Sequence, residues 1–182
     1  MFAGRKEELS SLNSFYEKAD ARVACVYGRK GMGKTTLLKE FCKDKTTVFF
    51  TAYPTTDVQE LSILAAAIAG GEVDFDEDDL TLPLLLDEIT KIGSRQPLLL
   101  IIDHYPYFIK AANDYDKILH SYVKEQWSVA TVCISPSAIA FHKTSLSLFV
   151  LRGGAMTYFA PSKPSCSYRE ASIRRYCGQV SA

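Results

Sequence analysis

The residues best suited to chemistry lie between positions 28 and 36, where the sequence reads Gly-Arg-Lys-Gly-Met-Gly-Lys-Thr-Thr. This is the G-x-x-x-x-G-K-T pattern of a phosphate-binding loop, which requires a strand before it and a helix after it. Glycine allows such a loop to turn its backbone N–H groups toward a phosphate, because a side chain would block the approach. The helix that comes next adds free N–H groups and the positive end of its dipole.

Two side chains of this loop have separate expected roles. Lys34 is expected to reach the β- and γ-phosphates, and the Thr35 hydroxyl is expected to ligate Mg²⁺. The residues expected to contact the nucleotide here share the loop and the start of its helix, and they are Gly28, Arg29, Lys30, Gly31, Met32, Gly33, Lys34, Thr35 and Thr36. The sequence therefore predicts a nucleotide-binding protein.

Two further candidates stand at the ends of apolar runs. The run from Pro97 ends in Asp103, and the run from Trp127 ends in Ser135. Strands buried on both faces of a parallel sheet read this way, and ligands bind at their carboxyl ends. Asp103 is therefore expected to hold Mg²⁺ through water, with a capping aspartate as the alternative. Ser135 is a candidate sensor of the γ-phosphate, with a turn serine before Pro136 as the alternative.

The elements that must position these residues alternate between strands and helices. Apolar and β-branched runs predict strands over 23–27, 46–53, 97–103, 127–135 and 155–161. Helical spacing predicts helices over 2–19, from 34, and over 57–68, 82–92 and 111–123. We expect Asp57 to cap the third helix and Gly93-Ser94 to end the fourth. This alternation predicts a three-layer α/β/α sandwich around a mostly parallel five-stranded sheet.

An acidic stretch over 72–79 has the alternating acids of a calcium-binding loop. However, Asp79 takes the place where such a loop needs glycine, and Leu85 takes the place of its bidentate glutamate. We therefore interpret the stretch as a solvated loop.

The bulk composition is that of a globular chain without net charge. Of its 182 residues 47% are hydrophobic, and 21 basic residues balance 21 acidic ones. Neutrality does not point to nucleic acid or a membrane surface as a partner, and the apolar runs are too short to span a bilayer. The first residues lack the apolar core of a signal peptide. Five scattered cysteines without a C-x-x-C pair are typical of free thiols, so we expect a cytoplasmic protein.

Several segments together resemble one known family. They are residues 2–9, the loop at 27–35, Phe50-Thr51-Ala52 and residues 100–107. Over most of residues 2–141 the chain resembles the archaeal-type P-loop ATPases of the AAA+/STAND superfamily. The resemblance implies five parallel strands, with an added strand between the loop strand and the strand that carries Asp103. It also implies that Phe2, Gly4 and Arg5 lie near the adenine and that ATP with Mg²⁺ is the ligand.

The chain departs from this family at position 104. The family usually reads Asp-Glu-Phe-Pro-Tyr where this chain reads Asp-His-Tyr-Pro-Tyr over 103–107. That glutamate polarises the attacking water, so His104 stands where the catalytic base is expected. A histidine accepts a proton near neutral pH, but its reach and charge differ from those of a carboxylate. The favoured prediction is an ATP binder with weak or impaired hydrolysis, in which Lys34, Asp103, His104 and Ser135 are the candidate catalytic residues. An active ATPase that uses His104 as its base is an alternative.

The second departure concerns the C-terminal part. Family members continue into a helical lid and usually a winged-helix region, so we divide the chain into an ATPase core over 1–165 and a segment over 166–182. That segment is interpreted as the start of a lid, or as an unstructured basic tail that could touch nucleic acid. By analogy with the family, Arg152 is a candidate arginine finger toward a neighbour's nucleotide. A further alternative is a non-enzymatic switch, in which ATP orders a surface for a protein partner or a second copy.

Overall fold

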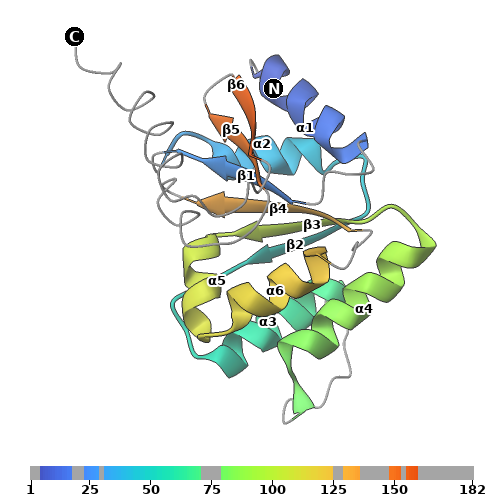
Figure 1. Ribbon diagram of the computed structural model, residues 1–182, viewed down its shortest axis with the longest axis vertical. Coiled ribbons are helices and arrows are strands. Elements are labelled where there is room, and N and C mark those ends of the chain that lie inside the picture. Colours follow the sequence, from blue (N-terminus) through green and yellow to red (C-terminus); the bar gives the residue numbers. More distant parts are fainter. Residues whose placement is uncertain are drawn as a thin grey trace.

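A six-stranded sheet with helices on both faces makes up the part of the chain that the computed structural model describes (Figure 1). The described residues are 5–17, 23–28, 31–70, 79–124, 129–135, 148–152 and 155–159. The strands are β1 (Val23–Tyr27), β2 (Thr47–Thr51), β3 (Leu99–Asp103), β4 (Ala130–Ser135), β5 (Leu148–Arg152) and β6 (Ala155–Phe159). The helices are α1 (Lys6–Glu17), α2 (Lys34–Phe41), α3 (Asp57–Ala69), α4 (Leu82–Arg95), α5 (Tyr105–Ala111) and α6 (Tyr115–Lys124).

The sheet has the order β2-β3-β4-β1-β5-β6. All neighbouring pairs from β2 to β5 are parallel, and β6 pairs antiparallel with β5 at the edge. The mostly parallel sheet is confirmed, and β4 is the added strand between β1 and β3. Strand β5 was not predicted, so the sheet has six strands where five were expected. Residues 148–152 and 155–159 flank Gly153-Gly154, a pair typical of a two-residue hairpin, so this local pattern could have revealed both strands.

Alternate residues of the central strands enter two separate apolar layers. Along β1, Val23 and Cys25 pack with the layer under α3, α4, α5 and α6, whereas Ala24 and Val26 pack with the layer under α1 and α2. Figure 1 shows these two helix groups on opposite faces of the sheet. Because both faces are covered, β1 is apolar throughout and has no polar alternation. The predicted α/β/α sandwich is confirmed.

Three predicted helix boundaries are wrong. Thr56, not Asp57, caps α3, because its hydroxyl accepts from the N–H of Gln59 at 3.4 Å. Helix α4 runs through Gly93-Ser94 to Arg95, since its stripe of buried leucines and isoleucine holds it against the sheet. The predicted helix over 111–123 is two helices, α5 and α6, with a break between them at 112–114. Gly70 ends α3 in the left-handed conformation.

None of the helices in the described ranges combines the length and the apolar character needed to cross a membrane. Of the acidic stretch over 72–79, only Asp79 is among the described residues. Residues 166–182 lie outside the described part entirely. The interpretation of 72–79 as a solvated loop and the domain boundary at 165 therefore stay predictions.

Candidate functional site

The loop after β1 has the backbone that a phosphate-binding loop needs. Gly31 and Gly33 have φ angles of 85° and 72°, in the left-handed region that glycine adopts with little strain. Gly33 is also the residue before α2, and the helix begins with a bond from the N–H of Leu37 to the Gly33 carbonyl at 2.9 Å. Helix α2 has no acidic side chain in its first turn. Its positive end is therefore open to an anion.

Lys34 lies across this loop in the structure. Its Nζ donates to the carbonyl oxygen of Gly28 at 2.6 Å, which ties the first residue of the motif to the first turn of α2. Partial burial lowers the pKa of the Lys34 ammonium, Asp103 opposes that shift, and the positive charge of Arg5 adds to it. A polyphosphate beside Lys34 would favour its charged form.

Asp103 and Thr35 meet at the carboxyl end of β3. The Thr35 hydroxyl donates to Asp103 Oδ2 at 2.8 Å, although 68 residues separate them in the chain. Asp103 is only 3% exposed, and its Oδ1 accepts from the N–H of His104 at 2.8 Å. The sheet thus brings Asp103 beside the loop, at the position expected from the sequence. Two hard oxygen donors side by side are the kind of group that Mg²⁺ prefers.

No cluster of three or more histidine, cysteine or acidic side chains that could hold a metal ion occurs among the described residues. The Thr35–Asp103 pair fits a common arrangement for Mg²⁺, in which the ion keeps waters and phosphate oxygens as its remaining ligands.

His104 has an unusual backbone and an exposed side chain. Its φ and ψ are 57° and 40°, a left-handed conformation that is uncommon for a residue other than glycine. This turn starts α5 and aims the backbone N–H at Asp103. The imidazole ring packs edge-on against Tyr107, with ring centroids 5.9 Å apart. In this structure His104 thus contacts Asp103 through its backbone and Tyr107 through its ring.

The other predicted site residues are less completely described. Ser135 ends β4 and pairs in register with Tyr27, the last residue of β1, so the sheet brings it beside the start of the loop. Its side chain and that of Arg152 at the end of β5 lie outside the described part. Phe2, Gly4, Arg29 and Lys30 lie outside it altogether. Met32 and Thr36 are described, and both are exposed.

Arg5 contacts the phosphate-binding loop. Its guanidinium donates to the carbonyl oxygen of Met32, and the place near the adenine that the resemblance implies stays a prediction. The spacing of 27 residues gives no local signal for this contact.

Glu60 is a buried acid that sequence reasoning misses. It is 1% exposed, and its Oε2 accepts from the N–H of Tyr53 at 3.2 Å and the hydroxyl of Thr55 at 3.4 Å. Its Oε1 and the Tyr115 hydroxyl are buried, and neither has a hydrogen-bond partner among the described residues. Burial raises the pKa of the Glu60 carboxyl, and the two hydrogen bonds partly offset this. The available signal is an acid one turn before Leu64, on the apolar face of the helix.

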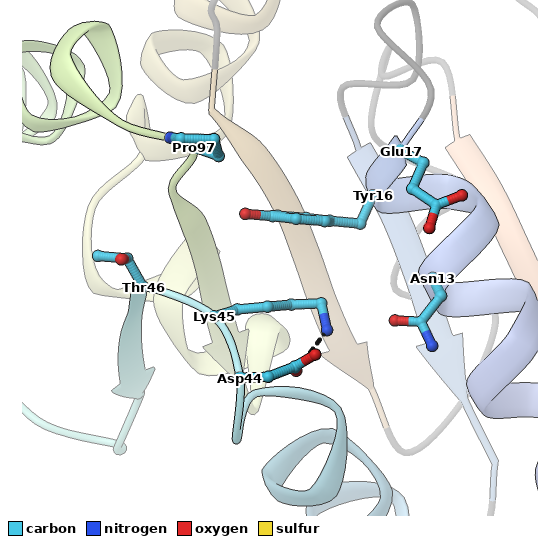
Figure 2. A pocket seen from close by; sticks show the side chains of 7 residues that line it. All are labelled: Asn13, Tyr16, Glu17, Asp44, Lys45, Thr46 and Pro97. Carbon is cyan, nitrogen blue, oxygen red and sulfur yellow. Dashed lines mark hydrogen bonds and ion pairs between the residues drawn. The ribbon is translucent and has the colours of Figure 1, made fainter.

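A groove of about 530 Å³ lies between α1, the turn after α2 and the start of β3. Figure 2 shows Tyr16 extended toward Pro97 and Lys45 paired with Asp44. Lys45 Nζ donates to Asp44 Oδ1 at 2.6 Å and to the carbonyl oxygen of Phe41 at 3.0 Å. The groove adjoins the amino ends of β2 and β3, whereas Asp103 lies at a carboxyl end. Of the predicted site residues that the structure describes, none lines this groove.

A parallel sheet that presents this loop after β1 and an acid at the end of β3 defines the class of P-loop nucleotide-binding domains. Residues 2–152 match the family described as an ATPase domain predominantly from Archaea. The chain belongs to that family. A segment of 45 residues is 42% identical to an uncharacterized ATP-binding protein of Methanocaldococcus jannaschii and covers 25% of this chain and 76% of that protein.

Solved structures share the fold. A Walker-type ATPase of Pyrococcus abyssi matches with a TM-score of 0.63 and 14% identity, over 78% of this chain and 47% of that one. The ORC1 protein of Aeropyrum pernix, solved in complex with DNA, matches with a TM-score of 0.58 and 17% identity, over 98% and 50%. The chain thus spans about half the length of these proteins. At such identities the likeness establishes the fold alone.

Proposed function

We propose that this chain binds ATP with Mg²⁺ and hydrolyses it slowly or not at all. Membership in an ATPase family supports ATP as the ligand. The observation that carries the proposal is the 2.8 Å contact between Thr35 and Asp103 beside Lys34, because it brings the three expected ligand groups to one edge of the sheet. In this proposal the loop N–H groups and Lys34 bind the phosphates.

Thr35 and Asp103 would hold Mg²⁺ in this site. When bound, the ion would neutralise charge on the β- and γ-phosphates. The protein's own contribution is to keep the hydroxyl and the carboxylate in contact before any ligand arrives. Burial of Asp103 and the bond from the N–H of His104 hold the carboxylate in that position.

Slow hydrolysis is expected from the residue after Asp103. A rapid ATPase needs a group that positions and polarises the attacking water, and a carboxylate does so in this family. Here that position carries an imidazole that packs against Tyr107. The carboxyl of Glu60 does not substitute for it in this proposal, because it is 1% exposed and therefore closed to an attacking water. In this proposal the chain therefore has the groups that bind phosphate but lacks the group that activates the attacking water.

The test measures ATP–Mg²⁺ binding and phosphate release on one purified sample. Lys34→Ala should weaken ATP binding by about tenfold or more, because a charge-assisted contact to phosphate is lost. Asp103→Asn should remove most of the Mg²⁺ dependence of binding. Lys39→Ala, an exposed lysine on the same helix, is the matched control and should bind as the wild type does. Unchanged affinity in Lys34→Ala would refute the proposal.

A further inference from the structure

Arg5 makes a contact that the proposed binding of ATP and Mg²⁺ does not use. It immediately precedes α1, and its guanidinium donates to the carbonyl oxygen of Met32. Met32 lies between the two left-handed glycines, Gly31 and Gly33, and two residues before Lys34. The arginine therefore binds the backbone of the phosphate loop at the point where the loop turns into α2.

Helix α1, which begins at the next residue, holds the backbone of Arg5 in place. Its carbonyl oxygen accepts from the N–H of Leu9 at 3.1 Å, which opens α1. Leu12 and Phe15 of that helix are fully buried against the sheet. Arg5 itself has a φ of 58°, a conformation that costs energy in a residue other than glycine. A packed helix thus holds a strained residue whose side chain reaches across to the loop.

The positive charge of Arg5 acts on Lys34, a cation at the end of the phosphate loop. Arg5 lowers the pKa of Lys34, in addition to the larger effect of burial, while Asp103 acts in the opposite direction. Two cations that share a partly buried site repel each other when no anion is present. A polyphosphate bound between the loop N–H groups and Lys34 would attract both cations and so offset the repulsion between them.

We propose that Arg5 is a positioning residue for the phosphate end of the nucleotide. It holds the loop through Met32 and adds its charge to that of Lys34, so it governs affinity for phosphates and not the choice of base. This inference rests on the proposed function and deepens it. It differs from what the family resemblance implies, namely a place for Arg5 beside the adenine.

The test compares the affinities of three probes: Mg–ATP, Mg–GTP and inorganic tripolyphosphate with Mg²⁺, which has no base. Arg5→Gln should weaken all three by a similar factor of about ten, since a charged hydrogen-bonding group is lost. Its ATP affinity should also depend less steeply on salt, because one cation is missing. Arg5→Lys should restore the salt dependence and part of the affinity. Lys6→Gln removes a neighbouring exposed charge and should leave every affinity within about twofold of the wild type.

Two results would overturn the inference. If Arg5→Gln loses ATP affinity and retains tripolyphosphate affinity, Arg5 serves the base. If its affinities are unchanged and only the melting temperature without ligand falls, Arg5 serves stability alone. Should Arg5→Gln fail to fold, Arg5→Lys answers the same question, because it keeps the charge without the planar fork that binds Met32. Wild-type protein that binds neither ATP nor tripolyphosphate would instead contradict the proposed function.

Discussion

At the level of single residues, the chemistry of this chain depends on the pair Asp103 and His104. The carboxylate accepts from Thr35 through one oxygen and from the N–H of His104 through the other. The same left-handed turn that makes the second bond leaves the imidazole exposed beside Tyr107. A side chain at position 104 can therefore be changed without removing the backbone bond that steadies Asp103.

His104→Glu should raise the rate of phosphate release. It returns a carboxylate to the place where the family has its water-polarising group, and a positioned general base contributes about 10²–10⁴-fold to a rate. We expect an increase of about tenfold or more in steady-state phosphate release, with ATP affinity little changed. His104→Gln is similar in size to the glutamate variant but lacks its charge, and it should remain slow. If instead the wild type releases phosphate readily and His104→Ala abolishes it, His104 is the base and slow hydrolysis is wrong.

At the level of helices and strands, α3 is tied to the carboxyl edge of the sheet by a buried acid. Glu60 accepts from Tyr53 and Thr55 in the segment after β2, and the preceding N–H, that of Ala52, donates to the carbonyl oxygen of Asp103 at 3.0 Å. This connected set of bonds joins α3 to the strand that carries the proposed Mg²⁺ ligand. The other oxygen of this carboxyl, Oε1, is buried and has no hydrogen-bond partner within the described part of the chain, which makes the ionised form costly.

Glu60→Gln should stabilise the protein at neutral pH and not at acidic pH. Because burial raises the pKa of this carboxyl above its ordinary value of 4.5, the folded state binds the proton more tightly than the unfolded state does. The carboxyl therefore favours folding fully only below its ordinary pKa. That contribution is lost as the pH rises through the raised value. The glutamine keeps an acceptor oxygen and does not ionise.

The measurement is urea unfolding of both proteins between about pH 4 and pH 8, a range that starts below the ordinary pKa of the carboxyl. The stability gained by Glu60→Gln should grow with pH and level off at about 1 kcal/mol, the order of cost for a poorly satisfied buried polar group. Glu88→Gln, an acid on the exposed part of α4 that pairs with Lys91, is the matched control. A gain that is constant with pH would show that Glu60 ionises as easily in the folded protein as in the unfolded one.

At the level of the whole molecule, the site joins parts of the chain that lie far apart in sequence. Lys34 and Thr35 come from α2, Asp103 comes from β3, and Arg5 precedes α1. A ligand that contacts all of them binds the folded state and not the unfolded one, so binding must raise stability by mass action.

ATP with Mg²⁺ should therefore raise the melting temperature. At a free concentration of about one hundred times Kd, the expected gain is about 2.7 kcal/mol. For a chain of this size that gain corresponds to an increase of about 5–10 °C. Differential scanning fluorimetry with and without Mg–ATP measures it, and Lys34→Ala supplies the control. An equal increase in Lys34→Ala would show that the ligand binds somewhere else.

The helices and strands were predictable to different degrees for physical reasons. The strands at 23–27 and 99–103 are continuous apolar runs, which a sheet covered on both faces requires. The boundaries of α3 and α4 were misjudged, because Thr56 caps α3 in place of its neighbour Asp57, and because tertiary packing carries α4 through Gly93. The strand order came only from the family resemblance, since strands buried on both faces carry no polar pattern that selects a neighbour.

The class of this protein is specified by local patterns in its sequence. The spacing from Gly28 to Thr35 and the acid at the end of an apolar run both indicate phosphate and Mg²⁺ chemistry without reference to the rest of the chain. The folded arrangement was needed to learn that Thr35 contacts Asp103 and that Arg5 binds the phosphate loop. The reason is that these contacts depend on how the helices pack on the sheet, and packing between residues distant in sequence leaves no periodicity or motif along the chain.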